Sequence, residues 1–301
     1  MLECLLEFGG NFIHGNFFSL KRIITGFCSL IFDYIALSPP HLNALGVEGL
    51  KNIIRENSQP LRPISTGLKP ILTPLKPTQC LVLDIYGTVL ISQRTDAQLA
   101  WNQLLKNHSL TPPEISLEHL ILREHTRAKA LGITHPEIDI RELWRELFPE
   151  KDPERLALEY ELLSHQVWPM PGLKIPSHLH LGIVSNAQFY TPLLLETLCP
   201  LHADPALTFY SYQHHLAKPG PELFEKLCQS LQAYQIQPSE VVYLGNDHEN
   251  DIIPAKKVGF QTVLFAGDAR SLKYCPELEA PDAIITDLTQ LSSLLRVSSL
   301  T

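Results

Sequence analysis

Apolar and polar positions follow two different patterns along the chain from residue 80 onward. Short apolar runs cover residues 80–83, 181–184, 207–210, 241–244, 262–265 and 283–285. Between the later runs, stretches such as 221–231 and 251–258 repeat their apolar residues at helical spacing. Short buried strands separated by helices are typical of a parallel sheet with helices on its faces. The pattern therefore predicts an α/β core of three layers.

About a hundred residues separate the first apolar run from the second, far more than one crossover connection needs. Apolar residues recur at helical spacing in four parts of this interval, which are residues 95–108, 117–131, 140–148 and 153–166. The sequence Trp168-Pro169-Met170-Pro171-Gly172 then ends the helical pattern. We therefore expect a helical segment over residues 92–170, inserted between two strands of the sheet.

The segment before residue 80 has a different character. Residues 23–37 are apolar, but the run is too short for a membrane span and Asp33 interrupts it. An amphipathic helix is the simpler interpretation, and we expect no membrane attachment through residues 1–40. Five prolines between residues 58 and 79 block regular helix and favour an extended chain. We predict an N-terminal appendage over residues 1–57 and a Pro-rich linker over residues 58–79.

Composition narrows the classes of partner. The formal net charge is −8 and Lys and Arg form no run, which argues against a protein that binds nucleic acid through its phosphates. The six cysteines contain no C-x-x-C pair, so the sequence offers neither a zinc ribbon nor a thioredoxin-like motif. A reduced, cytoplasmic compartment is the simplest expectation for such scattered cysteines.

Polar residues gather where the predicted strands end. Asp84-Ile85-Tyr86-Gly87-Thr88 follows the first strand, Ser185-Asn186 follows the second, Lys218-Pro219 lies in a loop after the third, and residues 245–251 follow the fourth. Ligands of such sheets bind outside the carboxyl ends of the strands, so these residues are expected to share one site. A carboxylate, a hydroxyl, an ammonium group and an acidic cluster together indicate chemistry on an anionic small molecule.

These residue types suit transfer of a phosphoryl group. A carboxylate is a weak nucleophile, but it attacks well when a cation cancels its repulsion from a phosphate. A hydroxyl, main-chain N–H groups and a lysine can hold the non-bridging oxygens of the phosphate. Carboxylates at two strand ends supply the hard oxygen ligands that Mg²⁺ prefers.

In order and spacing, the four segments resemble the four motifs of the haloacid dehalogenase (HAD) superfamily of hydrolases, over about residues 80–290. The resemblance implies a Rossmann-like core and a covalent aspartyl intermediate on Asp84. It implies that the transferring group is held by Ser185 and Lys218, and that further substrate contacts come from Gly87, Thr88 and Asn186. It also implies a Mg²⁺ ion with ligands among Asp84, the main-chain carbonyl of Tyr86, Asn246, Asp247 and Asp251.

The helical segment of residues 92–170 resembles the cap that many superfamily members insert after the first motif. Closure of such a cap over the active site excludes water and usually sets specificity. The core would then comprise residues 80–91 and 171–301. Anion contacts from this segment could come from Arg94, Arg123, Arg127 and Lys129, although a solvated helix face is the simpler interpretation of each.

Two positions depart from the phosphatase pattern. Tyr86 stands where superfamily phosphatases usually carry a second Asp, which protonates the leaving oxygen and later activates water. A Tyr there resembles the 2-haloacid dehalogenase branch, whose Asp attacks carbon and expels a halide that needs no proton. Asn246 stands where phosphatases have an Asp after the Gly. The acidic loop that follows still looks more like a Mg²⁺-binding loop than like that of the metal-independent dehalogenases.

Three hypotheses follow from these residues. The first is a Mg²⁺-dependent phosphatase of a small phosphorylated metabolite, acting through an aspartyl-phosphate on Asp84. The second is hydrolytic dehalogenation of a small 2-haloacid by the same carboxylate. The third is a degenerate site, marked by Tyr86 and Asn246, that serves ligand binding or interaction without catalysis.

Overall fold

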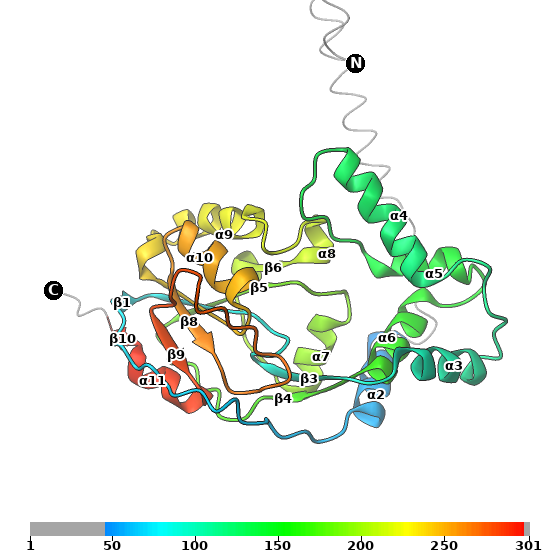
Figure 1. The fold of residues 1–301 in the computed structure, drawn as a ribbon, viewed down its shortest axis with the longest axis horizontal. Coiled ribbons are helices and arrows are strands. Elements are labelled where there is room, and N and C mark those ends of the chain that lie inside the picture. Colours follow the sequence, from blue (N-terminus) through cyan, green and yellow to red (C-terminus); the bar gives the residue numbers. More distant parts are fainter. Residues whose placement is uncertain (1–45, 298–301) are drawn as a thin grey trace, which may run out of the picture. The chain divides into compact units, whose positions relative to one another are not determined.

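The structure is a computed structural model that describes residues 46–297, drawn as coloured ribbon in Figure 1. The predictions for residues 1–40, including membrane attachment, lie outside the described residues. None of the helices within residues 46–297 combines the length and the apolar character that a membrane span requires.

Six parallel strands form the central sheet, and they are β2 (Cys80–Leu83), β5 (His180–Ser185), β6 (Thr208–Tyr210), β7 (Val241–Gly245), β8 (Gln261–Phe265) and β9 (Ala283–Ile285). Their order across the sheet is β6-β5-β2-β7-β8-β9. Numbered along the chain, this order is 3-2-1-4-5-6, the doubly wound arrangement in which the direction of winding reverses between β2 and β7. The predicted Rossmann-like α/β fold is confirmed, and its ligand crevice is expected at this reversal.

Helices cover both faces of the sheet, with α9 (Glu222–Ala233) and α10 (Ile253–Lys257) in one set and α7 (Thr191–Leu198) and α11 (Leu291–Leu294) in the other (Figure 1). Successive residues of β2 alternate between the two faces. Cys80 and Val82 belong to the apolar cluster of α9, whereas Leu81 and Leu83 belong to the cluster that contains the apolar residues of α7 and α11. Each fully buried side chain of this size contributes about 1.5–3 kcal/mol, so the strand that carries the first motif is firmly fixed.

The predicted helical segment contains four helices, α3 (Ala97–Asn107), α4 (Leu117–Ala130), α5 (Ile140–Leu147) and α6 (Pro153–Ser164). Each begins after an Asp or Ser whose side chain accepts a hydrogen bond from a main-chain N–H of the first turn. Helices α3, α5 and α6 share an aromatic cluster, with neighbouring ring centroids 5.6 to 6.3 Å apart among Trp101, Trp144, Phe148 and Tyr160. The apolar stripe that predicted the third of these helices is therefore core packing.

A two-stranded ribbon that the sequence pattern did not indicate connects the sheet to these helices. Strand β3 (Leu90–Arg94) pairs antiparallel with β4 (His165–Pro169), so that Arg94 lies opposite His165. The predicted helix over residues 153–166 is wrong at its end, because α6 stops at Ser164 and the next residues belong to β4.

The segment before β2 is packed along the sheet and the helices. Helix α2 (Gly46–Asn57) buries Leu50 and Ile54 and contacts α6 and α7. The Pro-rich chain that follows is extended, and its Ile71 pairs with Ile284 of β9. Strand β1 (Pro77–Thr78) then pairs with β10 (Arg296–Val297). The boundaries predicted at residues 57, 79, 91 and 170 stay predictions.

Candidate active site

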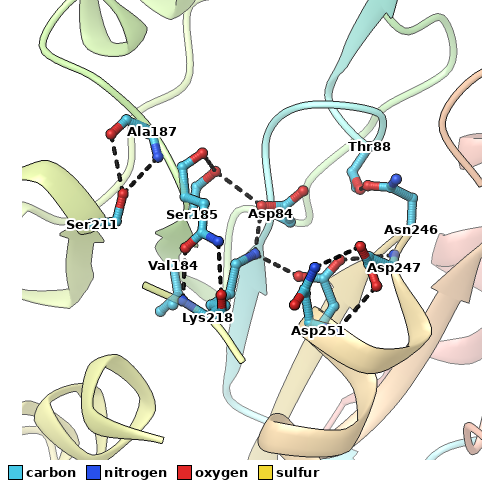
Figure 2. Close-up of polar contacts among 12 residues, drawn as sticks. Asp84, Thr88, Val184, Ser185, Ala187, Ser211, Lys218, Asn246, Asp247 and Asp251 are labelled. Carbon is cyan, nitrogen blue, oxygen red and sulfur yellow. Dashed lines mark hydrogen bonds and ion pairs between the residues drawn. The ribbon is translucent and has the colours of Figure 1, made fainter. Parts of the chain in front are cut away.

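Three of the four predicted motif segments meet where the winding of the sheet reverses. Asp84 directly follows β2, Ser185 ends β5, and Asn246 directly follows β7. Because β5 and β7 are the two neighbours of β2, these strand ends lie side by side, and Lys218 joins them from the loop before α9 (Figure 2). A cavity of about 760 Å³ opens over them, lined by Asp84 and Lys218 among others.

The two carboxylate oxygens of Asp84 have different surroundings. Oδ1 accepts hydrogen bonds from Ser185 Oγ at 2.9 Å and from Lys218 Nζ at 2.7 Å (Figure 2). Oδ2 accepts none from the residues that the structure describes. Asp84 is buried but lines the cavity. The carboxylate is therefore held through one oxygen, and the other remains available for attack on a substrate.

Lys218 is the central cation of the site. Its ammonium group lies between two carboxylates, 2.7 Å from Asp84 Oδ1 and 2.5 Å from Asp251 Oδ1, and it contacts the Tyr243 hydroxyl at 3.0 Å. Burial works to lower the pKa of Lys218, but the Asp251 and Asp84 charges outweigh it and raise the pKa above its ordinary value. Lys218 therefore stays charged and offsets the negative charge of the nucleophile.

Asp251 is the second carboxylate that contacts Lys218. It is 1% exposed, its Oδ1 faces Lys218, and its Oδ2 accepts the main-chain N–H of Asp247 at 3.0 Å. Burial, only partly offset by Lys218, raises the pKa of Asp251 to about 6. Both oxygens are thus engaged inside the protein, and the contacts of Asp251 are those of a residue that positions Lys218.

Asp247 is engaged at the start of the following helical turn. Its Oδ1 accepts the main-chain N–H groups of Glu249 and Asn250, and its Oδ2 accepts the side chains of Asn250 and Lys273. Partial burial would raise the pKa of Asp247, but Lys273 and these N–H groups lower it below its ordinary value. In this arrangement Asp247 caps a helix.

The first and fourth motif segments interlock beside the cavity. Asn246 Oδ1 accepts the Thr88 hydroxyl at 3.0 Å, and its Nδ2 donates to the Ser271 carbonyl at 2.7 Å. Gly87 has φ of +84°, and a Cβ there would lie 2.6 Å from Asn246 Nδ2, so only glycine allows this approach. Thr88 is fully buried and faces Asn246, whereas Gly87 and Asn246 themselves line the cavity.

Ser185, the last residue of β5, and Asn186, which follows it, also contact neighbouring residues of the site. Ser185 is fully buried and donates to Asp84, so its hydroxyl orients the nucleophile. The Asn186 side chain makes two hydrogen bonds to the main chain of Lys218. Its Oδ1 accepts the Lys218 N–H at 2.8 Å, and its Nδ2 donates to the Lys218 carbonyl at 3.0 Å. Asn186 also lines the cavity. The predicted substrate contacts of Ser185, Thr88 and Asn186 stay predictions.

The predicted Mg²⁺ ligands differ in whether one of their oxygen atoms is free to bind a metal ion. Within residues 46–297, no three His, Cys, Asp or Glu side chains cluster in a way that could hold a metal ion. Three oxygens of the predicted set remain, namely Asp84 Oδ2, the second lone pair of Asn246 Oδ1 and the Tyr86 main-chain carbonyl, which accepts no hydrogen bond from the described residues. Mg²⁺ can be bound by one carboxylate together with neutral oxygens, waters and a substrate phosphate. These three groups fit a weak site, whereas both oxygens of Asp247 and of Asp251 already accept hydrogen bonds, and metal binding by these two residues stays a prediction.

Tyr86 is poorly suited to supply the proton that the missing second Asp would give. Its hydroxyl is hydrogen bonded to Thr191 Oγ1 at 2.8 Å. Burial, with the nearby Glu161 carboxylate, raises the pKa of Tyr86 well above its ordinary value. Such a phenol is too weak an acid to protonate a leaving oxygen efficiently near neutral pH.

Three further cations line the cavity, namely Arg94, which was among the expected anion contacts, and Arg270 and Lys273, which the sequence interpretation left aside. Arg270 and Lys273 lie in the loop after β8, and Arg94 ends β3. Arg270 is paired with Asp268 and Lys273 with Asp247, whereas the Arg94 side chain makes no hydrogen bond or ion pair with the described residues. The position of Arg270 and Lys273 after a strand end was the signal that could have identified them. Arg94 is therefore the one of these three cations that pairs with no carboxylate of the described residues, which suits it to contact an anion.

The chain is similar in sequence to known proteins. A family model for haloacid dehalogenase-like hydrolases matches residues 78–259. Rhythmically expressed gene 2 protein of Drosophila melanogaster is 28% identical over 90 residues, which are 30% of this chain and 34% of that protein. Glyceraldehyde 3-phosphate phosphatase of Pyrococcus furiosus is 35% identical over 78 residues, which are 26% of this chain and 31% of that protein. The matched segments thus span about a third of each relative.

A solved structure of 2-haloacid dehalogenase from Pseudomonas syringae pv. tomato aligns with a TM-score of 0.49 at 18% identity, covering 72% of this chain and 97% of the other. The matched family region, residues 78–259, extends over more than half of the chain and contains all four motif segments. The chain therefore belongs to the haloacid dehalogenase-like hydrolases.

Proposed function

We propose that this hydrolase is a phosphatase of a small phosphorylated metabolite and that Asp84 is its nucleophile. The observation that carries the proposal is the asymmetry of the Asp84 carboxylate, whose Oδ1 is held by Ser185 and Lys218 while Oδ2 remains free beside the cavity. Arg94, which lines the cavity and pairs with no carboxylate of the described residues, supports an anionic substrate. The similarity to a protein named glyceraldehyde 3-phosphate phosphatase supports phosphate as the group transferred.

The chemistry proceeds in two displacements. Asp84 Oδ2 attacks phosphorus, the bond from phosphorus to the ester oxygen breaks, and the departing oxygen takes a proton from water. Lys218 offsets the charge on Asp84 and the phosphate during the attack. Water then attacks the aspartyl-phosphate at phosphorus, loses a proton, and releases inorganic phosphate and the Asp84 carboxylate. Because Tyr86 supplies no acid, esters with good leaving groups should react fastest.

The proposal includes a weak requirement for Mg²⁺. Asp84, the Tyr86 carbonyl and Asn246 would hold the ion, whose contribution when bound is to neutralise charge on the phosphate. Only one of these three groups is a carboxylate, so the affinity is expected to be low.

Replacing Asn246 with Asp should therefore lower the Mg²⁺ concentration that gives half-maximal activity by about tenfold, because a second carboxylate joins the ligand set. The same change removes the donor to the Ser271 carbonyl, so we expect a lower Tm without Mg²⁺. Asp247→Asn is the matched control and should leave the Mg²⁺ requirement within about twofold of the wild type. An unchanged requirement in Asn246→Asp, or a large change in Asp247→Asn, would contradict this ligand set.

One observation favours a second candidate, hydrolytic dehalogenation of a 2-haloacid. The Tyr86 hydroxyl is committed to Thr191, so the described site has no evident acid for an alkoxide leaving group, and a halide needs none. In that reaction Asp84 Oδ2 would attack carbon, the halide would leave, and water would hydrolyse the resulting ester.

Two substrates separate the candidates. The purified full-length protein is assayed on p-nitrophenyl phosphate and on 2-chloropropionate, each with Mg²⁺ and with EDTA. The proposal expects phosphate release that falls in EDTA and returns with Mg²⁺. Halide release that EDTA does not change would replace the proposal with the dehalogenase. Absence of both activities would favour the degenerate, non-catalytic site.

The proposed partner is an anionic small molecule, and no nucleic acid is proposed. The cytoplasmic location stays a prediction, which gains support from the free thiols of Cys80, Cys199, Cys228 and Cys275.

A further inference from the structure

The Pro-rich segment before β2 contacts a loop that lines the active-site cavity. Residues 62–66 of this segment, which we call the strap, form neither helix nor strand. Residues 268–273, which we call the wall loop, follow β8, and residues 270–273 line the cavity above Asp84. Both the strap and the wall loop lie outside the region, residues 78–259, that matches the family model. Their roles therefore have to be inferred from their contacts.

Four hydrogen bonds join the strap to residues 266–270. They run from Thr66 Oγ1 to the Ala266 carbonyl at 2.8 Å, from the Ile64 N–H to Asp268 Oδ1 at 3.2 Å, from the Ala269 N–H to the Ile64 carbonyl at 2.8 Å, and from Arg270 Nη2 to the Arg62 carbonyl. Asp268 is 1% exposed, so its contact with the strap is shielded from water. The strap residues do not line the cavity. The strap therefore reaches a ligand in the cavity only through the wall loop.

Arg270 connects the strap and the wall loop to β3. Its Nε lies 3.0 Å from Asp268 Oδ1, and its Nη1 donates to Gln93 Oε1 at 2.8 Å. Gln93 lies in β3 directly before Arg94, the cavity-lining cation that pairs with no carboxylate of the described residues. The guanidinium group of Arg270 thus fixes the strand end that carries Arg94.

The wall loop also contacts the turns that follow β2 and β7. The Ser271 carbonyl accepts Asn246 Nδ2 at 2.7 Å, and the Ser271 hydroxyl donates to the Gly87 carbonyl at 3.4 Å. The Lys273 N–H donates to the Asn246 carbonyl at 3.1 Å. The wall loop is therefore hydrogen bonded both to the strap and to the first and fourth motif segments, and its position sets the shape of the cavity.

We propose that the strap is a positioning element of the active site, which holds the wall loop and Arg94 in the arrangement that receives the anionic part of the substrate. A loop held in one arrangement binds a ligand without first being ordered, whereas a loop that samples several arrangements lowers the apparent affinity. The hydrogen bonds that hold Asp84 come from Ser185 and Lys218, which belong to other elements. The strap should therefore affect KM more than kcat. This enzymatic consequence rests on the proposed function, whereas the positioning of the wall loop does not.

Two double variants of the full-length protein test the proposal. Ile64→Pro with Thr66→Val removes two of the strap's donors, since proline has no N–H and valine has no hydroxyl. Ile64→Ala with Thr66→Ser is the matched control, because both donors remain and the Ile64 side chain, which is 51% exposed, is lost in both variants. For p-nitrophenyl phosphate we expect the first variant to raise KM about three- to tenfold, with kcat within about twofold of the wild type. The control should keep both constants within about twofold.

Hydrogen exchange at the main-chain amides of Ala269 and Lys273 provides a readout that needs no substrate. The first variant should exchange both amides at least about tenfold faster than the wild type, and the control should exchange them at the wild-type rate. Lys273 is the more informative amide, because its N–H bonds to Asn246 and not to the strap.

Three results would overturn the proposal, namely a wild-type exchange rate at Lys273 in the first variant, a lower Tm with an unchanged KM, or the same rise of KM in the control. The second of these is the result expected of a strap with a merely structural role. Absence of p-nitrophenyl phosphate turnover in the wild type would overturn the proposed function alone, since exchange at Lys273 would still decide whether the strap positions the wall loop.

Discussion

Replacing Asp84 with Asn is expected to lower kcat/KM for p-nitrophenyl phosphate by at least about 10³-fold while the protein stays folded. The amide has no anionic oxygen to attack phosphorus. Its carbonyl oxygen can still accept from Ser185 and Lys218, as Oδ1 does in the native site, so the packing of the buried cluster should persist. Initial rates of phosphate release and thermal unfolding of the same preparation measure the two effects.

Asp96→Asn is a suitable control for this comparison. Asp96 caps α3 by accepting the Leu99 N–H, a role that Asn also fills, and it does not line the cavity above Asp84. Its activity should stay within about twofold of the wild type. If Asp84→Asn kept a tenth or more of the activity, water rather than Asp84 would have to be the nucleophile.

The sheet was predictable because its strands are buried on both faces. Runs such as residues 241–244 are continuously apolar, as expected for central parallel strands, and each predicted run lies on an observed strand apart from residue 207, which precedes β6. Strands β3 and β4 gave no such signal. Their sequences, LISQR and HQVWP, are only partly buried and carry polar residues that a half-exposed ribbon tolerates. Because β4 is also only partly buried, the helical spacing that predicted α6 continued over the first two residues of β4, 165 and 166.

The clustering of the motif residues was also predictable, since parallel strands share their carboxyl edge. The residue with which each carboxylate pairs could not be predicted from the sequence. Asp247 and Asp251 are four residues apart, a spacing equally compatible with two metal ligands and with one helix cap and one lysine partner. The contacts to Lys273 and Lys218 distinguish these roles, and both lysines are distant in sequence. Glu161 belongs to no recognisable sequence motif. Its position near Tyr86 could not be predicted, because only the tertiary fold brings α6 beside that residue.

Replacing Lys218 with Met is expected to produce the largest loss of stability. The change leaves Asp84 and Asp251 buried side by side without their common cation. Removing one partner of a buried ion pair typically costs about 3–5 kcal/mol, and we expect a loss of that size in the free energy of unfolding at pH 8. Activity should fall by at least about 10²-fold, because the lysine also offsets charge on the attacking carboxylate.

The loss in the free energy of unfolding of Lys218→Met should become smaller as the pH is lowered. The pKa of Asp251 is about 6 in the folded protein, above its ordinary value of 3.8, so its proton is bound more tightly in the folded state. The stability that this proton contributes is fully present below about pH 4 and is lost as the pH rises through 6. Without Lys218 the pKa of Asp251 rises further. At pH 5 the carboxyl is then neutral, and the penalty of an unpaired buried charge is largely absent.

Denaturant unfolding at pH 8 and pH 5 measures this difference, with Lys273→Met as the matched control. Lys273 also pairs with an Asp of the fourth motif, but its side chain is 71% exposed, so its loss should cost less than about 1 kcal/mol at either pH. Adding Asp251→Asn to Lys218→Met should restore much of the stability at pH 8, because one of the two unpaired charges is removed. Equal losses at both pH values would mean that Lys218 acts through packing and that the charge pairing around Asp84 contributes little to the fold.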